Sequence, residues 1–229
     1  MKLHTNNKQT QMQLNKLKAE GIFLDLDGTI VDSTEAYIEA ARIAFQAIGK
    51  KAPAEATLLE IPRRIEQYKT IDDITEGYTR EFLPIYLNAY HSIAEQTTRL
   101  LPNMLSTLET LSKKSKLALI TMRHVPKEVI WKELDYLGIN KYFNQVITAL
   151  DTPKPKPSPQ PLIKCVETLK LNLQDCIIAG DSINDVRAGK AAGVKTVAVL
   201  SGLYCRETLE KEKPDLLLPD ISALIQHIE

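Results

Sequence analysis

The stretch that decides the fold of this chain is Gly21-Ile22-Phe23-Leu24-Asp25-Leu26-Asp27-Gly28-Thr29. It begins with a short apolar run, which is typical of a strand buried on both faces of a parallel sheet. Asp25 and Asp27 follow two residues apart, so their carboxylates point the same way if the chain stays extended. Because open α/β folds bind ligands at the carboxyl ends of their strands, this stretch predicts a strand and part of a site.

Further apolar runs with polar ends follow in the second half of the chain. They are KLALITM (116–122), FNQVITALD (143–151), DCIIAGDS (175–182) and VKTVAVLSG (194–202). Stretches of helix length lie between them, and Gly138 and Gly193 are typical helix stops. This alternation with short connections predicts an α/β fold, a doubly wound parallel sheet formed by residues 21–33 and 99–229.

The segment between the first and second runs is much longer than one crossover helix. An amphipathic pattern closed by Gly49 and a second helical pattern at 71–93 lie there, with no strand pattern between them. Residues 34–98 are therefore predicted to form a small α-helical insertion. Residues 1–20 are rich in polar amides and are expected to be a polar N-terminal extension without a core of its own.

Composition excludes several classes of partner. Lys+Arg and Asp+Glu are both 29, so the net charge is zero and a nucleic-acid partner is not expected. No run approaches the ~18 apolar residues of a membrane span, so no membrane partner is expected. The chain has three cysteines, which favours a reducing compartment and a cytoplasmic location. Whether the protein is a monomer or a homodimer stays open.

The acidic motif has companions at the ends of later strands. Thr121 ends the second run, Lys156 lies in a proline-rich segment, and the fourth run leads into Gly180-Asp181-Ser182-Ile183-Asn184-Asp185. An alternative is that Asp27-Gly28 only forms an acidic turn. Carboxylates at two strand ends are costly, however, unless a positive charge lies between them.

In these motifs, their order and their spacing, the chain resembles the haloacid dehalogenase (HAD) superfamily from residue 21 to about 221. The resemblance implies a Rossmann-like core with a helical C1 cap inserted after the first motif. It further implies that Asp25 is a nucleophile that forms an aspartyl-phosphate and that Asp27 is its acid/base partner. Thr121 would bind a phosphoryl oxygen, and Lys156 would neutralise the phosphoryl group together with Asp25.

The resemblance also implies Mg²⁺ as cofactor. Its ligands would be the carboxylates of Asp25 and Asp181 and the backbone carbonyl of Asp27, with Asp185 as a further ligand or as an orienting group. Lys154 fits the same Lys-Pro pattern as Lys156, which is preferred because it lies nearer the following helix. The prolines around them predict a stiff active-site loop, although a polyproline linker is an alternative.

Four positions outside the motifs stay open. Arg123 and His124 are expected to be exposed loop residues rather than substrate contacts. Arg63 and Arg64 could grip a second anionic group, but a solvated helix face explains them equally well.

By resemblance, the predicted function is a Mg²⁺-dependent phosphatase for a small phosphorylated metabolite, most similar to phosphoglycolate phosphatases. Asp27 favours phosphoryl transfer over dehalogenation. A sugar phosphomutase like β-phosphoglucomutase, a pyrophosphatase and a non-enzymatic binding protein are the alternatives. The mutases carry a cap histidine where this chain has Tyr37, and a valine where it has Thr29, so both positions favour hydrolysis.

Overall fold

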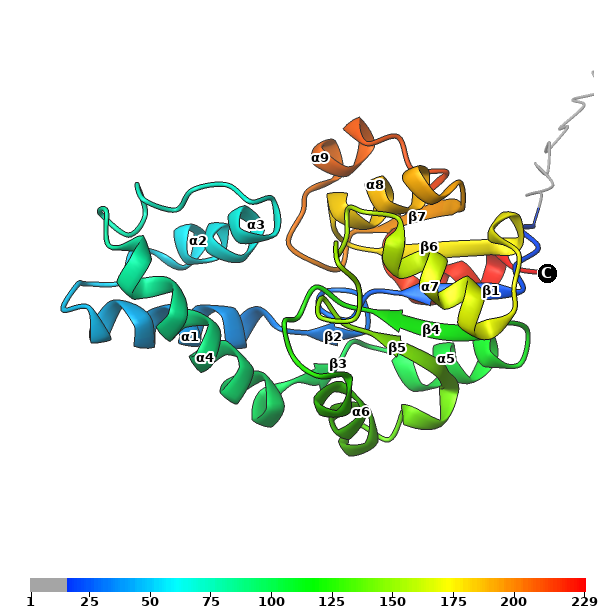
Figure 1. Ribbon diagram of the computed structural model, residues 1–229, viewed down its shortest axis with the longest axis horizontal. Helices are drawn as coiled ribbons and strands as arrows, with labels where there is room; N and C mark the ends of the chain where they lie inside the picture. Colours follow the sequence, from blue (N-terminus) through cyan, green and yellow to red (C-terminus); the bar gives the residue numbers. More distant parts are fainter. Residues whose placement is uncertain (1–15) are drawn as a thin grey trace, which may run out of the picture.

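The computed structural model describes residues 16–229 and is built around one six-stranded parallel sheet (Figure 1). The strands lie in the order β5-β4-β1-β6-β7-β8. They are β1 (Gly21–Leu24), β4 (Lys116–Ile120), β5 (Phe143–Ile147), β6 (Cys176–Gly180), β7 (Lys195–Val199) and β8 (Leu216–Leu218). The predicted α/β doubly wound fold is confirmed. Only β8 lacks a counterpart among the predicted runs, because its apolar segment is very short.

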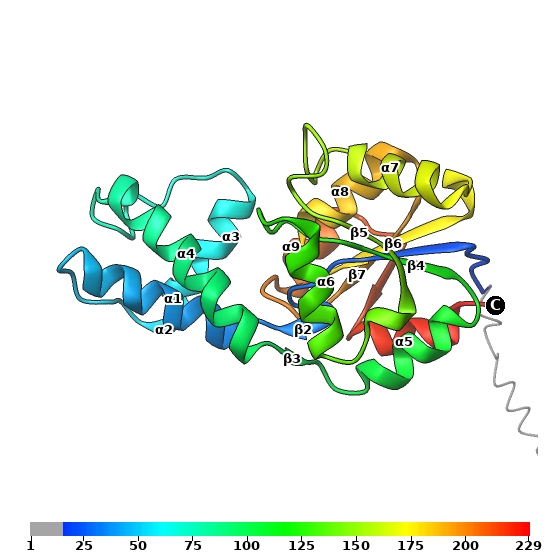
Figure 2. The ribbon, with the colours of Figure 1, turned by 60° about the horizontal axis from the view of Figure 1, so that its bottom comes forward.

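Helices cover both faces of the sheet (Figures 1 and 2). Successive strand residues face opposite layers, so Ile22 and Leu24 belong to one buried cluster and Phe23 to another. The first layer contains α5 (Met104–Ser112), α6 (Lys127–Tyr136) and the 3₁₀ helix η3 (Ile221–His227), and the second contains α7 (Gln160–Leu169) and α8 (Ile183–Ala192). The short helices η1 (Asn140–Tyr142), η2 (Leu173–Asp175) and α9 (Arg206–Lys211) lie in connections.

The order of the strands reverses direction at β1. From β1 the chain adds β4 and β5 on one side, and later β6, β7 and β8 on the other. Gly21 to Leu24 pair with β4 on one edge and with β6 on the other. Such a reversal leaves a crevice beyond the carboxyl ends of the central strands, and the residues that follow β1 and β6 border it.

The segment between β1 and β4 folds as a helical insertion with its own core. It contains α1 (Thr34–Ala47), α2 (Glu55–Leu58), α3 (Glu60–Glu66) and α4 (Thr79–Thr97). The strands β2 (Val31–Asp32) and β3 (Arg99–Leu100) pair antiparallel, so the two connections to the sheet run side by side (Figure 2).

The second helix of the insertion differs from its predicted bounds. The sequence pattern placed it at 71–93, whereas α4 begins at Thr79. Glu76 and Gly77 both have positive φ angles, 53° and 86°, which interrupt a right-handed helix at that point. Residues 71–78 are turns instead, and the helix continues to Thr97.

The N-terminal extension is described only from residue 16 onward, and the predicted segment at 1–15 lies outside the described residues. The backbone NH of Leu17 donates a hydrogen bond to His227 at 2.6 Å, and Ala19 is buried in the main core. These residues therefore belong to the sheet domain rather than to a segment without a core. In the part of the chain that the structure describes, no helix has the length and apolar character needed to cross a membrane.

Candidate active site

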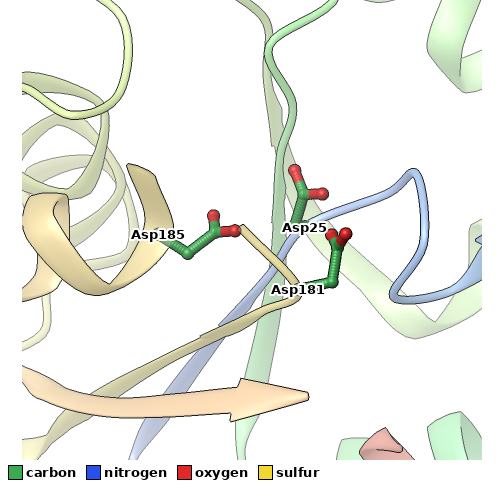
Figure 3. Close-up of side chains that lie close together, drawn as sticks. All are labelled: Asp25, Asp181 and Asp185. Carbon is green, nitrogen blue, oxygen red and sulfur yellow. The ribbon is translucent and has the colours of Figure 1, made fainter. Parts of the chain in front are cut away.

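Three carboxylates from different elements meet beyond the carboxyl ends of β1 and β6 (Figure 3). Asp25 follows β1, Asp181 follows β6, and Asp185 lies in the first turn of α8. One carboxylate oxygen from each lies within 4.8 Å of the others, and all three side chains are buried. The fold thus brings together the acids of the first and last sequence motifs.

Lys156 is the cation that faces this cluster. Its Nζ lies 2.6 Å from Asp25 Oδ1 and 2.6 Å from Asp185 Oδ1, and it donates a third hydrogen bond to the carbonyl of Ile120. The side chain is only 1% exposed. Lys154 of the same proline-rich loop is exposed. The loop between β5 and α7 therefore delivers Lys156, and not Lys154, to the carboxylates.

The start of α8 orients Asp185. Ser182 caps the helix by accepting the NH of Asn184, while Asp185 Oδ2 accepts the NH of Ser182 at 3.1 Å. Both oxygens of Asp185 are therefore engaged, one by Lys156 and one by the cap. These contacts fit a role for Asp185 in orienting Lys156 better than a role as a metal ligand with a free oxygen.

Two glycines leave room for Asp181. A Cβ at Gly202 would lie 1.8 Å from Asp181 Oδ2, and one at Gly28 would lie 2.7 Å from it. Gly28 also has a φ of +75°, which side-chain-bearing residues rarely adopt. Gly28 of the first motif is thus required both by the positive φ of the turn and by the close approach of the Asp181 carboxylate.

The cluster carries more negative charge than Lys156 neutralises. Burial and the neighbouring carboxylate of Asp185 raise the pKa of Asp25 to about 7, although Lys156 opposes the shift. Burial and then Asp25 raise the pKa of Asp181 well above its usual range. A buried set of hard oxygen donors with excess negative charge is the donor set that Mg²⁺ prefers. Asp25 and Asp181, with Asp185 beside them, therefore fit the predicted ion.

Asp27 has different partners from Asp25. β1 ends at Leu24, and Asp27 in the turn that follows is not part of the three-carboxylate cluster. Its carboxylate accepts hydrogen bonds from Ser33, from Tyr90 at 2.8 Å and from Arg123. The side chain of Asp27 thus lies beside the cluster, and a metal-ligating role for its backbone carbonyl stays a prediction.

Arg123 corrects an expectation drawn from the sequence. It was expected to be an exposed loop residue, yet it is 7% exposed and pairs with both Asp27 and Glu133. Thr121, directly after β4, is buried, and its Oγ1 accepts the NH of Arg123 at 3.2 Å. His124 is exposed, as expected. A position three residues beyond a strand carries no sequence signal for burial.

The helical insertion contacts the crevice through α3. Asn184 of the core donates to the carbonyl of Glu66 at 2.8 Å, and Gln67 donates to the Tyr204 hydroxyl at 3.0 Å. Burial, and then the charges of Asp25 and Asp185, raise the pKa of Glu66 to about 8. Glu66 has no motif around it, so sequence reasoning missed it.

The two insertion arginines do not face this crevice. Arg63 pairs with Glu60 of its own helix, and Arg64 pairs with Asp73. Both ion pairs lie within the insertion and involve partly exposed side chains. They fit the solvated helix face rather than a grip on a second anion.

Comparison with known proteins identifies the family. The sequence model of the haloacid dehalogenase-like hydrolases matches residues 22–199. The chain is 30% identical to the phosphoglycolate phosphatase of Escherichia coli strain K12, over 93% of this chain and 94% of that protein. The chain therefore belongs to the haloacid dehalogenase-like hydrolases, and the resemblance inferred from its motifs is confirmed.

Other relatives agree with this class. A protein of Caldanaerobacter subterraneus that carries a provisional name as a pyrophosphatase is 27% identical, over 93% of this chain and 96% of its own. A haloacid dehalogenase-like family hydrolase from Streptococcus pneumoniae has the same fold, with a TM-score of 0.76 at 22% identity, over 91% of this chain and 98% of that one. The family and the phosphoglycolate phosphatase relative support a phosphatase.

Proposed function

We propose that this protein is a Mg²⁺-dependent phosphatase that hydrolyses a small phosphorylated metabolite through an aspartyl-phosphate on Asp25. The observation that carries the proposal is the arrangement of Asp25, Lys156 and Asp181 at the strand edge. One carboxylate is held by a buried ammonium at 2.6 Å, and a second carboxylate completes an oxygen-rich pocket beside it. A phosphoryl group placed there meets a nucleophile and a cation together.

The first step joins an Asp25 oxygen to phosphorus and breaks the bond between phosphorus and the alcohol oxygen. Lys156 offsets the negative charge of Asp25 and of the phosphoryl group, since Asp185 and Asp25 raise the pKa of Lys156 despite its burial and keep it charged. Thr121 supplies a hydroxyl at the end of β4 for a phosphoryl oxygen. Mg²⁺, when bound by Asp25 and Asp181, would neutralise further phosphoryl charge.

The second step joins a water oxygen to phosphorus and releases phosphate from Asp25. Asp27 would take the proton of this water, and in the first step it would give a proton to the leaving alcohol. Although burial opposes it, the Arg123 guanidinium holds the pKa of Asp27 below its usual range. Asp27 is therefore ionised in this conformation, which is its starting state for the second step.

The geometry around Tyr37 favours hydrolysis over mutase chemistry. Tyr37 lies in α1, is buried and stacks on Tyr90 with ring centroids 4.8 Å apart. Burial, and then the charge of Asp27, raise the pKa of Tyr37 well above its usual range, so the phenol stays protonated. A mutase needs a base that accepts a proton from the second sugar hydroxyl, and Tyr37 cannot supply one near neutral pH.

We infer that the helical insertion is the family's C1 cap, which would exclude water during the first step and select the substrate. The contacts of α3 with Asn184 and Tyr204 support that role, because they join the insertion to core residues near the carboxylates. The free thiols of Cys165, Cys176 and Cys205 support the expectation of a cytoplasmic location. A monomer and a homodimer are both compatible with this site.

The experiment that tests the proposal is a phosphate-release assay over a panel of phosphorylated metabolites with Mg²⁺. The panel includes phosphoglycolate, pyrophosphate, and β-glucose 1-phosphate with a trace of the bisphosphate. We expect release from at least one phosphomonoester, and loss of release in excess chelator. Net conversion to glucose 6-phosphate faster than phosphate release would establish a mutase, and activity on pyrophosphate alone would establish a pyrophosphatase.

A further inference from the structure

A chamber lies between the helical insertion and the core, and Asp27 is one of its lining residues. Its volume is about 390 Å³, which is within the range of sites that hold a drug-sized ligand. Residues of α1, α3 and α4, the loop at 68–71 and residues 122–124 line it as well. Because Asp27 is placed to exchange a proton with the leaving oxygen, the alcohol attached to that oxygen extends into this chamber.

We propose that the alcohol of the natural substrate is a largely apolar group of about the size of an aromatic ring or larger. This inference rests on the proposed phosphatase function. It goes beyond that function by naming the chemical class of the substrate. It also departs from glycolate, the small charged alcohol in the name of the E. coli relative.

The walls of the chamber are mainly hydrocarbon. They include Ile65, Leu83, Leu87, Met122 and the rings of Tyr86 and Tyr90. Removing apolar ligand surface from water against such walls contributes roughly 25 cal/mol per Å². An apolar alcohol gains this contribution, whereas a two-carbon alcohol leaves most of the chamber unfilled.

The charges around the chamber disfavour a carboxylate in the alcohol. Of the lysine and arginine side chains that line it, Lys69 is exposed and Arg123 is already paired with Asp27 and Glu133. Glu66, which also lines the chamber, is an acid and offers no positive charge to a carboxylate. A neutral alcohol needs no such partner.

The test compares phosphate esters of primary alcohols that differ in what fills the chamber. Ethyl phosphate and 2-phenylethyl phosphate have similar leaving groups, and phosphoglycolate adds a carboxylate to the two-carbon frame. We expect kcat/KM for 2-phenylethyl phosphate to exceed that for ethyl phosphate by about tenfold or more, from burial of the ring. Phosphoglycolate should do no better than ethyl phosphate.

The position of the alcohol is tested by filling the chamber. Leu87→Trp should reduce the preference for 2-phenylethyl over ethyl phosphate toward unity. Asn88→Trp, which adds the same ring at an exposed position of α4, should keep the preference. A thermal unfolding curve for each variant shows whether it is folded. The comparison of the esters on the wild-type protein does not depend on any variant.

The outcomes distinguish a wrong substrate class from a wrong phosphatase function. If phosphoglycolate is hydrolysed with a higher kcat/KM than 2-phenylethyl phosphate, the substrate class is wrong while the phosphatase function stands. Equal kcat/KM for ethyl and 2-phenylethyl phosphate also overturns the substrate class. Absence of phosphate release from every ester in the presence of Mg²⁺ overturns the proposed function itself.

Discussion

Arg123 holds Asp27 with two hydrogen bonds, from Nε to Oδ2 at 2.9 Å and from Nη2 to Oδ1 at 2.6 Å. The third nitrogen of the guanidinium reaches Glu133 at 2.5 Å, so one buried cation joins the motif acid to α6. The guanidinium also lies over the ring of Tyr90, 5.4 Å from its centroid. The orientation of Asp27 in the site therefore depends on a residue outside the family motifs.

Replacing Arg123 should destabilise the protein strongly. Arg123→Met leaves the buried carboxylates of Asp27 and Glu133 without their cation, and losing one partner of a buried ion pair costs about 3–5 kcal/mol. The free energy of unfolding from urea titration measures the loss. Arg187→Met breaks a partly exposed pair with Glu212 and should cost less than about 1 kcal/mol. Equal losses for the two variants would refute a structural role for the Arg123 pair.

The two lysines of the proline-rich loop should differ sharply. Lys156→Ala removes the cation that contacts Asp25 and should reduce kcat by about 10²–10³, as expected when developing charge loses its stabilising group. Lys154→Ala alters an exposed side chain and should leave kcat within about twofold of wild type. Steady-state kinetics with Mg²⁺ measures both, and the reverse pattern would show that Lys154 is the catalytic lysine.

Glu66 should limit activity at alkaline pH. Burial, then Asp25 and Asp185, raise its pKa to about 8, so Glu66 is neutral below that pH and negative above it. Lys156 opposes this shift, and the Tyr204 hydroxyl donates to Glu66 Oε2 at 3.4 Å. Ionised Glu66 repels the anionic substrate, and kcat/KM should therefore fall as the pH rises through about 8.

The matched variants for this pH profile are Glu66→Gln and Glu60→Gln. Glu66→Gln cannot ionise and should keep kcat/KM high through the alkaline range. Glu60, on the same helix, pairs with Arg63, so Glu60→Gln should retain the wild-type profile. An unchanged alkaline fall in Glu66→Gln would assign it to another group.

Activity should require Mg²⁺ and should be inhibited by Ca²⁺. Ca²⁺ takes more oxygen ligands at longer distances, so it can draw both oxygens of Asp25 into coordination and leave none free to attack phosphorus. Phosphate release measured with each ion and with excess chelator tests this. Equal rates with the two ions would contradict the proposed roles of Asp25 and Asp181.

The sequence predicted the sheet and the acids because both depend on local patterns. The apolar run that ends at Leu24 indicates a buried strand, and the carboxyl ends of parallel strands meet at one edge of a sheet. The sequence alone therefore predicted that Asp25 and Asp181 lie close together. The preference for Lys156 over Lys154 needed only its position relative to the next helix.

The remaining parts of the site depend on contacts that no local pattern specifies. Arg123 is buried because Asp27 and Glu133, from distant elements, both face it. Glu66 lies on α3, where the sequence predicted no separate helix. Tyr86 lies on α4, whose start was predicted too early, since the break at Gly77 looks like one more helical residue in a pattern of apolar spacing. Substrate selection rests on these side chains, and so it was the least predictable property.

The central claim, covalent catalysis by Asp25, is tested most directly by trapping the intermediate in Asp27→Asn with 4-nitrophenyl phosphate and Mg²⁺. The nitrophenolate leaves without a proton, so formation of the aspartyl-phosphate proceeds while its hydrolysis, which needs the base, is slowed. The account predicts a burst of about one nitrophenolate per protein. After acid quench and borohydride reduction, peptide mass spectrometry should find homoserine at position 25, and the Asp25→Asn/Asp27→Asn double variant should show neither signal. Reduction at another residue, or a burst that survives in the double variant, would contradict the assignment of Asp25 as nucleophile.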